Sequence, residues 1–385
     1  MPSRQLALAR PWKRLLVGVA AGSLVLAAAG CDSSGSDTAA AGDGELSASQ
    51  QECVDKANEY LDDRGLLPET LPEELTPLSK PPVEGLTITR LFPGSVPTSA
   101  ALSQEIVDLA PVVGWTGRAL SYDGSVEDVN RKALEAIGYS DIVVIDGLPA
   151  AALQEPIRAA EQNGVLLMLG SITDPPVSVP GFGGTPLGGD TAERIAELAA
   201  YTFMQATNCQ GKAAAFGLPV EALQSQGNHM AEVLEAECED CSLSYTDIPF
   251  SDVGSPAATN TVVSRLQSDP SLNFAYFTIG DLAVGIEPAL RQAGLDVQVG
   301  GAIPVSQNLA ALQRDENAFW LGVPQGMTAA INIDTAARVL DTGQPVAGDY
   351  YPVPVYTPDN IESTDPIPVY PTDYEEQFEE LWQVG

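Results

Sequence analysis

The sequence predicts an α/β protein made of two Rossmann-like lobes, each a parallel sheet flanked by helices. Short apolar runs alternate with segments of helical periodicity, and the alternation occurs twice, before and after a glycine- and proline-rich stretch from Ser171 to Gly189. Continuous apolar strands separated by crossover helices are typical of parallel sheets that are covered on both faces. The chain of 385 residues is long enough for two such cores.

The chain begins with a segment that predicts export. Basic residues from Arg4 to Arg14 precede the apolar stretch LLVGVAAGSLVLAAAG, which ends directly before Cys31. This stretch is short for a membrane span, so residues 1–30 are predicted to be a cleaved signal. The ending AAAGC resembles a bacterial lipobox, in which Cys31 becomes the lipidated first residue. The alternative is an ordinary signal peptide cut near Ala29, with Cys31 unmodified.

Three further segments precede the folded body. Residues 31–50 are polar and of low complexity, which predicts a flexible tether. An acidic amphipathic helix is expected over 49–61. Five prolines between Leu67 and Pro82 predict a connector without regular structure. Residues 51–84 therefore form an N-terminal helix and connector, and the body begins at Gly85.

The body alternates strands and helices in two rounds. In the first round, strands are expected over 85–92, 118–122, 141–147 and 165–171, and helices over 99–114, 126–138 and 149–164. In the second, strands are expected over 211–218, 242–249, 274–280 and 297–304, and helices over 190–208, 221–237, 257–269 and 283–294. Two such lobes place a ligand between them, at the carboxyl ends of the strands.

Charge and cysteine content restrict the function. With 52 acidic and 18 basic residues the formal net charge is −34, which excludes nucleic acid as a partner. The acids are dispersed and indicate a solubilising surface. Four cysteines follow Cys31, and an even number in an oxidising compartment favours two disulfides in any of three pairings. The candidates are Cys53, Cys209, Cys238 and Cys241.

Catalysis and metal binding are not expected. Cys238 and Cys241 are spaced like a redox pair or half a zinc site, but neither a thioredoxin-like context nor a second ligand pair accompanies them. His229 is the only histidine, and no G-x-S-x-G motif is present. The sequence therefore predicts no enzyme activity, no metal and no cofactor, and a secreted hydrolase is disfavoured.

The order of segments resembles the type I periplasmic binding proteins, the ribose and galactose receptors of ABC importers, which share their fold with the ligand domains of lac-repressor-like regulators. The segments that carry the resemblance are 141–169, 188–203, 264–301 and 318–346. It implies three hinge crossovers, near Ser171–Asp174, Gly322–Gln325 and Val346–Val353. The first lobe would then comprise residues 85–172 and 324–346, and the second lobe 173–323 and 347–385, including the tail.

The resemblance also implies which side chains meet a ligand. The expected contacts are Ser95, Thr98, Asp146, Ser171, Gln224, Asp281 and Gln325. Helix capping is the alternative role for Ser95, Thr98 and Asp281, and plain surface is the alternative for Gln224. Four positions that contact sugar in the family are small or apolar here, so the expected ligand is a sugar, a sugar-like molecule or something less polar.

The function that the resemblance implies is transport. The mature chain is expected to be a monomer, lipid-anchored to the outer face of the cell membrane, on the periplasmic side where a second membrane exists. It would capture a small molecule in the interlobe cleft and deliver it to an ABC permease, with the lobes closing on the ligand. The alternative is a sensory lipoprotein that presents its ligand-bound lobes to a membrane signalling partner.

Overall fold

The computed structural model describes residues 46–64, 66–73, 75–171, 182–348 and 350–385. The predicted signal, Cys31 and the predicted tether up to residue 45 lie outside the described residues. Among the helices that are described, none is both long and apolar enough to cross a membrane.

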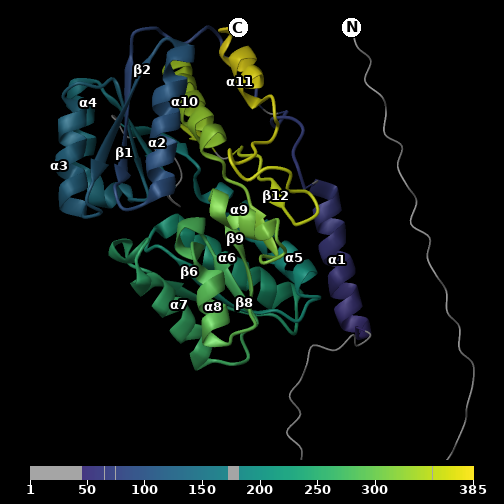
Figure 1. Ribbon diagram of the computed structural model, residues 1–385. Helices are drawn as coiled ribbons and strands as arrows, with labels where there is room; N and C mark the ends of the chain where they lie inside the picture. Colours follow the sequence, from purple (N-terminus) through teal and green to yellow (C-terminus); the bar gives the residue numbers. More distant parts are fainter. Residues whose placement is uncertain (1–45, 65, 74, 172–181, 349) are drawn as a thin grey trace, which may run out of the picture. The chain divides into compact units, whose positions relative to one another are not determined.

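The first lobe is a six-stranded sheet with helices on both faces. Its strand order is β11-β5-β4-β3-β1-β2, and all its strand pairs are parallel. Helices α2 and α10 pack together on one face, and α3 and α4 on the other (Figure 1). The strands are β1 (Thr87–Pro93), β2 (Thr116–Tyr122), β3 (Ile142–Asp146), β4 (Leu166–Gly170), β5 (Phe182–Pro186) and β11 (Val346–Gly348). The helices are α2 (Pro97–Leu109), α3 (Val126–Ile137), α4 (Gln154–Asn163) and α10 (Gln325–Thr342), with 3-10 turns η1 (Ala110–Val113) and η2 (Ala150–Leu153).

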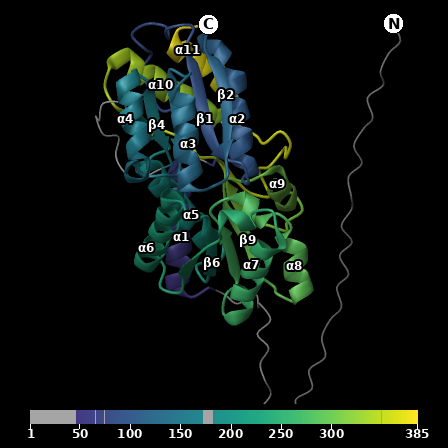
Figure 2. The same cartoon turned by 90° about the vertical axis from the view of Figure 1, so that its left-hand side faces the viewer.

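The second lobe repeats this architecture. Its strand order is β12-β10-β9-β8-β6-β7, and only β12 is antiparallel to its described neighbour. Figure 2 shows α5 and α6 on one side of the sheet, and α7 and α8 on the other. The strands are β6 (Lys212–Gly217), β7 (Ser242–Asp247), β8 (Phe274–Phe277), β9 (Gln298–Ala302), β10 (Phe319–Leu321) and β12 (Val355–Tyr356). The helices are α5 (Gly189–Ala206), α6 (Glu221–Glu237), α7 (Pro256–Ser268), α8 (Ile286–Ala293) and α9 (Ser306–Leu312), with 3-10 turns η3 (Phe250–Asp252) and η4 (Gly280–Ala283).

Local sequence explains where these elements start and stop. The Ser125 side chain accepts a hydrogen bond from the Asp128 amide at 3.1 Å and caps the start of α3. Helices α4, α8 and α10 each end at a glycine in the left-handed conformation, which glycine adopts without steric cost. The middle of β3 is fully buried, as its unbroken run of β-branched residues predicts.

The first crossover lies later than the sequence predicted. The chain leaves the first sheet after β5, at residues 187–188, and not near Ser171–Asp174. Strand β5 has the sequence FGGTP, which lacks an apolar run because α10 packs closely on it. A Cβ on Gly183 would lie 2.8 Å from a methyl carbon of Val339 and 2.9 Å from one of Leu166. The predicted second lobe therefore began too early.

The second crossover lies at residues 322–324, between β10 and α10, and the described part of the third lies at residues 350–354, between β11 and β12. The first lobe extends to Gly348 instead of ending at residue 346. The tail also differs from the prediction, because helix α11 (Tyr374–Trp382) packs on α10 of the first lobe. There the Trp382 indole donates a hydrogen bond to the Asp334 carboxylate at 2.9 Å.

The N-terminal helix α1 (Ala48–Arg64) packs on α5 of the second lobe. It begins two residues before the predicted tether ends. The Sγ atoms of Cys53 and Cys209 lie 2.07 Å apart and join α1 to the loop after α5. Those of Cys238 and Cys241 lie 1.97 Å apart, directly after α6. This pairing is one of the three that the sequence left open.

Candidate functional site

A cavity of about 170 Å³ lies between the two lobes, where the parallel strands of both sheets end. Its position agrees with the general rule that α/β sheets bind ligands at the carboxyl ends of their strands. The first-lobe wall is formed by Arg90, Pro93, Val96, Thr98, Ser99, Leu102, Tyr122, Gly124, Asp146, Gly147, Leu148, Ser171, Gln325 and Thr328. The second-lobe wall is formed by Leu218, Pro219, Val220, Leu223, Phe250, Ile279 and Ile303. Leu187 and Val323, on two of the crossovers, complete the lining.

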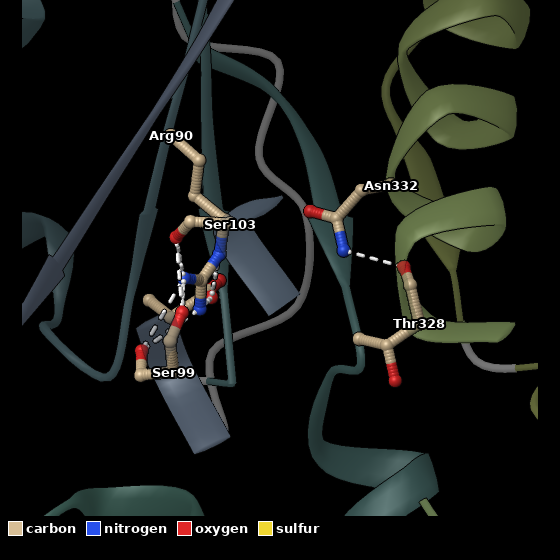
Figure 3. Close-up of polar contacts among 6 residues, drawn as sticks. Arg90, Ser99, Ser103, Thr328 and Asn332 are labelled. Atoms are coloured by element: carbon tan, nitrogen blue, oxygen red, sulfur yellow. Dashed lines mark hydrogen bonds and ion pairs between the residues drawn. The ribbon is translucent and has the colours of Figure 1, made fainter. Parts of the chain in front are cut away.

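A buried ion pair anchors the first-lobe wall. Arg90 on β1 is only 2% exposed, and its Nε donates a hydrogen bond to Asp146 Oδ2 at the end of β3 at 2.9 Å. Its Nη2 also donates to Asp146, and its Nη1 donates to the Ser99 carbonyl at 2.8 Å and to the Ser103 hydroxyl at 2.7 Å. Figure 3 shows Ser99 and Ser103 gathered around the guanidinium. All three nitrogens of the guanidinium thus have partners within the protein, and the pair carries no net charge.

Several hydrogen-bonding groups on the first-lobe wall have no hydrogen-bond partner among the described residues. Asp146 Oδ1, the Tyr122 hydroxyl and the side chains of Ser171 and Gln325 make no hydrogen bond to any described residue, although all four residues line the cavity. Burial, together with the nearby Asp146 carboxylate, raises the pKa of Tyr122 to about 12. Its phenol therefore stays protonated at neutral pH and can donate a hydrogen bond.

The described side chains of the second-lobe wall are all apolar. It is made of leucine, proline, valine, phenylalanine and isoleucine side chains at the ends of the β-strands and at the start of α6. Among the described residues, the polar side chains that line the cavity all come from the first lobe, including the start of α10. The cavity therefore presents two chemically different faces to whatever occupies it.

Three residues of the cavity other than glycine adopt a left-handed backbone. Ser171, Leu187 and Ile303 have φ values of 54°, 54° and 52°. This conformation is unfavourable for a leucine and more so for a β-branched isoleucine, and such residues cluster at functional sites. The backbone strain at these positions thus supports the cavity as a candidate functional site.

A hydrogen-bonded contact joins the lobes beside the cavity. Asp281 in η4 of the second lobe accepts hydrogen bonds from the backbone amide of Thr98, at 3.3 Å, and from the Thr98 hydroxyl. Burial raises the pKa of Asp281, because the charged form is desolvated. Asp281 therefore contacts the start of helix α2 and does not itself line the cavity.

The helix that begins at the second crossover completes the polar wall. Thr328 on α10 lines the cavity, and the Asn332 side-chain amide donates a hydrogen bond to its carbonyl at 2.8 Å (Figure 3). The Asn332 Oδ1 atom is buried and has no hydrogen-bond partner among the described residues. Buried polar atoms of this kind are commonly satisfied by ordered water.

The structure brings together four of the seven residues predicted to contact a ligand. Thr98, Asp146, Ser171 and Gln325 line the cavity. Ser95 is exposed and does not line it.

Gln224 does not line the cavity either. It lies next to cavity-lining Leu223, but its amide donates to both oxygens of Asp247, at 3.0 and 2.9 Å. Its side chain is therefore engaged at the surface of the second lobe.

Sequence reasoning missed Arg90, Tyr122 and Phe250 in the cavity. Arg90 had a readable signal, because the one charged residue of the mostly buried strand TITRLFP needs a buried partner. Tyr122 and Phe250 had none, since each lies at the end of an element and resembles ordinary core.

The cysteine cluster is the one group of metal-type ligands found among the described residues. The sulfurs of Cys53, Cys209 and Cys238 lie within 4.8 Å of one another. Each lies at bonding distance from another cysteine sulfur, so the donor set does not suit a metal ion.

Comparison with known proteins gives similarity in structure alone. No family model matches the sequence, and no curated protein matches it. A sugar ABC transporter from Yersinia enterocolitica subsp. enterocolitica matches with a TM-score of 0.63 and 12% identity, over 79% of this chain and 96% of its own. An ABC transporter solute-binding protein from Mycobacterium smegmatis with bound glycerol matches with a TM-score of 0.60 and 17% identity, over 73% of this chain and 98% of its own.

An ABC transporter periplasmic solute-binding protein from Actinobacillus succinogenes with bound D-allose gives a TM-score of 0.57 and 16% identity, over 71% of this chain and 98% of its own. Each match spans nearly the whole of the other protein and most of the described residues. Together with the two six-stranded sheets and the three crossovers, these similarities show that the chain has the type I periplasmic binding protein fold.

Proposed function

We propose that this chain is a solute-binding protein that holds a small molecule between its two lobes and has no catalytic activity of its own. The observation that supports this most directly is the interlobe cavity, to which both lobes contribute side chains. A ligand that touches both lobes stabilises the closed arrangement in proportion to its differential affinity for it.

The cavity's chemistry suits binding better than catalysis. Asp146 is held in place by Arg90, and the Tyr122 phenol has a pKa of about 12, so this phenol is not poised to give up a proton near neutral pH. Both are suited to orient hydroxyl groups of a ligand.

We also propose the cellular setting that the sequence indicates. Cys31 would carry a lipid that anchors the mature, monomeric chain outside the cytoplasm, at the outer face of the membrane. The paired cysteines would be disulfides, as that compartment permits. The partner that receives the ligand would be an ABC permease.

A thermal-shift screen of the purified full-length chain tests the binding role. Sugars, polyols, amino acids, nucleosides and aromatic alcohols would each be added, because a ligand that binds only the folded state raises the midpoint of unfolding. Any hit should be lost in Leu223→Trp, which fills the cavity. It should persist in Leu340→Trp, since Leu340 is 42% exposed on α10 and does not line the cavity. A panel without any shift, or a shift that survives Leu223→Trp, would contradict the proposed site.

A further inference from the structure

We propose that the ligand is a neutral molecule of about one ring, with hydroxyl groups along one edge and an apolar opposite face. The inference rests on the proposed function and deepens it by naming the ligand class. It follows from how polarity, charge and space are distributed in the cavity.

The first argument is the separation of the two walls. A pyranose ring with hydroxyls around its whole perimeter would direct some of them at the second-lobe wall. Among the described residues of that wall, no side chain can form a hydrogen bond, since they are residues such as Leu218, Leu223 and Phe250. Each hydroxyl buried there without a partner costs affinity, whereas a hydrocarbon face gains it. The ligand should therefore be apolar on the side that meets the second lobe.

The second argument is charge. Arg90 has no nitrogen left for a ligand carboxylate or phosphate, because its guanidinium donates to Asp146, Ser99 and Ser103. An anionic ligand would lie near the Asp146 carboxylate and would find no free cation to pair with. An ammonium group would lose its hydration to meet a carboxylate that Arg90 already neutralises. A neutral ligand avoids both costs.

The third argument is the set of unused groups on the first-lobe wall. Asp146 Oδ1 can accept a hydrogen bond and the Tyr122 hydroxyl can donate one, and neither binds any described residue. A ligand hydroxyl both donates and accepts, so adjacent hydroxyls on one edge match this arrangement. Ser171 and Gln325 offer further groups of both kinds on the same side.

The fourth argument is size. The cavity volume is about 170 Å³. A cavity of comparable size lined by apolar side chains accommodates a single six-membered carbon ring. A disaccharide or a nucleoside would exceed it.

Isothermal titration calorimetry on the full-length chain with three six-membered-ring probes tests the inference. The probes are trans-1,2-cyclohexanediol, with two hydroxyls on one edge, D-glucose, with hydroxyls all round, and cyclohexanecarboxylate, an anion. We expect the diol to bind at least tenfold more tightly than glucose, and the carboxylate to show no binding. Tighter binding of glucose or of the carboxylate than of the diol would overturn the inference while leaving the proposed function standing. Absence of diol binding would overturn it as well, and the broader thermal-shift screen then decides separately whether the cleft binds any solute.

Variants of the two walls sharpen the test. Leu223→Asn puts an amide on the apolar wall. We expect it to weaken diol binding about tenfold and to reduce the difference in affinity between the diol and glucose. The matched control, Leu340→Asn on α10, should leave both affinities unchanged. Tyr122→Phe removes only a hydroxyl that no described residue binds, so it should weaken the diol several-fold without lowering thermal stability. Equal diol affinity in the unaltered chain, Leu223→Asn and Tyr122→Phe would show that the two walls do not select the ligand.

Discussion

The contact between Asp281 and Thr98 gives a prediction about how the lobes close. Helix α2 starts at Pro97, and Val96 before it supplies no side-chain cap. The Asp281 carboxylate of the other lobe accepts the Thr98 amide at 3.3 Å, and also the Thr98 hydroxyl. It therefore caps α2 from across the cleft. Opening the lobes would break both hydrogen bonds.

Asp281→Ala removes both bonds, and Asp281→Asn keeps them. In Asn the side-chain oxygen can accept the Thr98 amide and the nitrogen can donate to the Thr98 hydroxyl. At about 0.5–1.5 kcal/mol for each net hydrogen bond, Asp281→Ala should cost the closed state about 1–3 kcal/mol. This corresponds to roughly a fivefold to 150-fold lower ratio of closed to open protein.

The pKa of Asp281 makes the effect depend on pH. Burial raises this pKa above its ordinary value in the structure described here, so ionisation opposes the closed state. Its contribution to closure is complete at pH values below the ordinary carboxyl pKa, and it declines as the pH rises through the raised pKa. Asp281→Asn carries no titratable group and should remove this dependence.

Small-angle scattering of the ligand-free chain, as a pH series from 4 to 8, measures the change. We expect the radius of gyration of the unaltered chain to rise with pH, that of Asp281→Asn to stay flat, and that of Asp281→Ala to be larger throughout. If Asp281→Ala and the unaltered chain give the same radius of gyration at every pH, the contact does not hold the lobes together. If Asp281→Asn behaves like Asp281→Ala, the hydrogen bonds are not what matters.

Three other predictions concern the segments around the lobes. Trp382→Phe removes the indole donor to buried Asp334 and should lower the free energy of unfolding by about 1–3 kcal/mol in urea titrations, whereas no change would mean that water replaces the bond. Replacing Cys53 and Cys209 together by serine removes the covalent link between α1 and the loop after α5 and should cost about 2–4 kcal/mol in the same assay, with a value near zero arguing against this disulfide. Cys31→Ala should move the chain from the membrane fraction to the soluble fraction and remove a lipid mass, and retention in the membrane would contradict the anchor.

Much of the fold could be predicted because its signals are local. Strands such as β3 and β8 are short apolar runs bounded by polar residues, and the helices between them repeat apolar positions with helical spacing. Strand β5 escaped this reasoning, since its FGGTP sequence is set by the approach of α10 and not by its own hydrophobicity. The position of α11 on the first lobe depends on tertiary contacts, such as the hydrogen bond of Trp382 to Asp334, which no local pattern reveals.

The site could be predicted only in part, because contacts in a cleft depend on the direction of each side chain. Gln224 and Leu223 are neighbours on α6, and the helix turns the leucine toward the cavity and the glutamine toward Asp247. A misjudgement of one position on a helix changes the face by about 100°. The sequence predicts Asp281 as a ligand contact or as the cap of its own helix, and its role as the cap of a helix in the other lobe required the tertiary structure.

The segments outside the two sheets bear on how far the lobes can separate. Besides the three crossovers, the chain passes between the lobes twice more. The connector leaves α1 on the second lobe, where the Leu66 carbonyl accepts a hydrogen bond from β12. It then reaches the first lobe at Leu78, whose amide donates to the carbonyl of Leu381 on α11. The tail runs from β12 to α11, which is held at Trp382.

The connector and the tail are each held at both ends by contacts with the lobes. A hinge rotation must therefore either move these contacts or break them. Breaking buried apolar packing is costly, since Leu71, Leu78, Phe378 and Trp382 are all buried in a hydrophobic cluster that extends into both lobes. We therefore expect a smaller opening than a hinge of three crossovers alone permits. A restricted opening lowers the free energy that a ligand must supply to close the cleft, and a small, mostly apolar ligand with few hydrogen bonds has little to supply. A restricted opening of the lobes is thus consistent with a cavity that has one polar wall and one apolar wall.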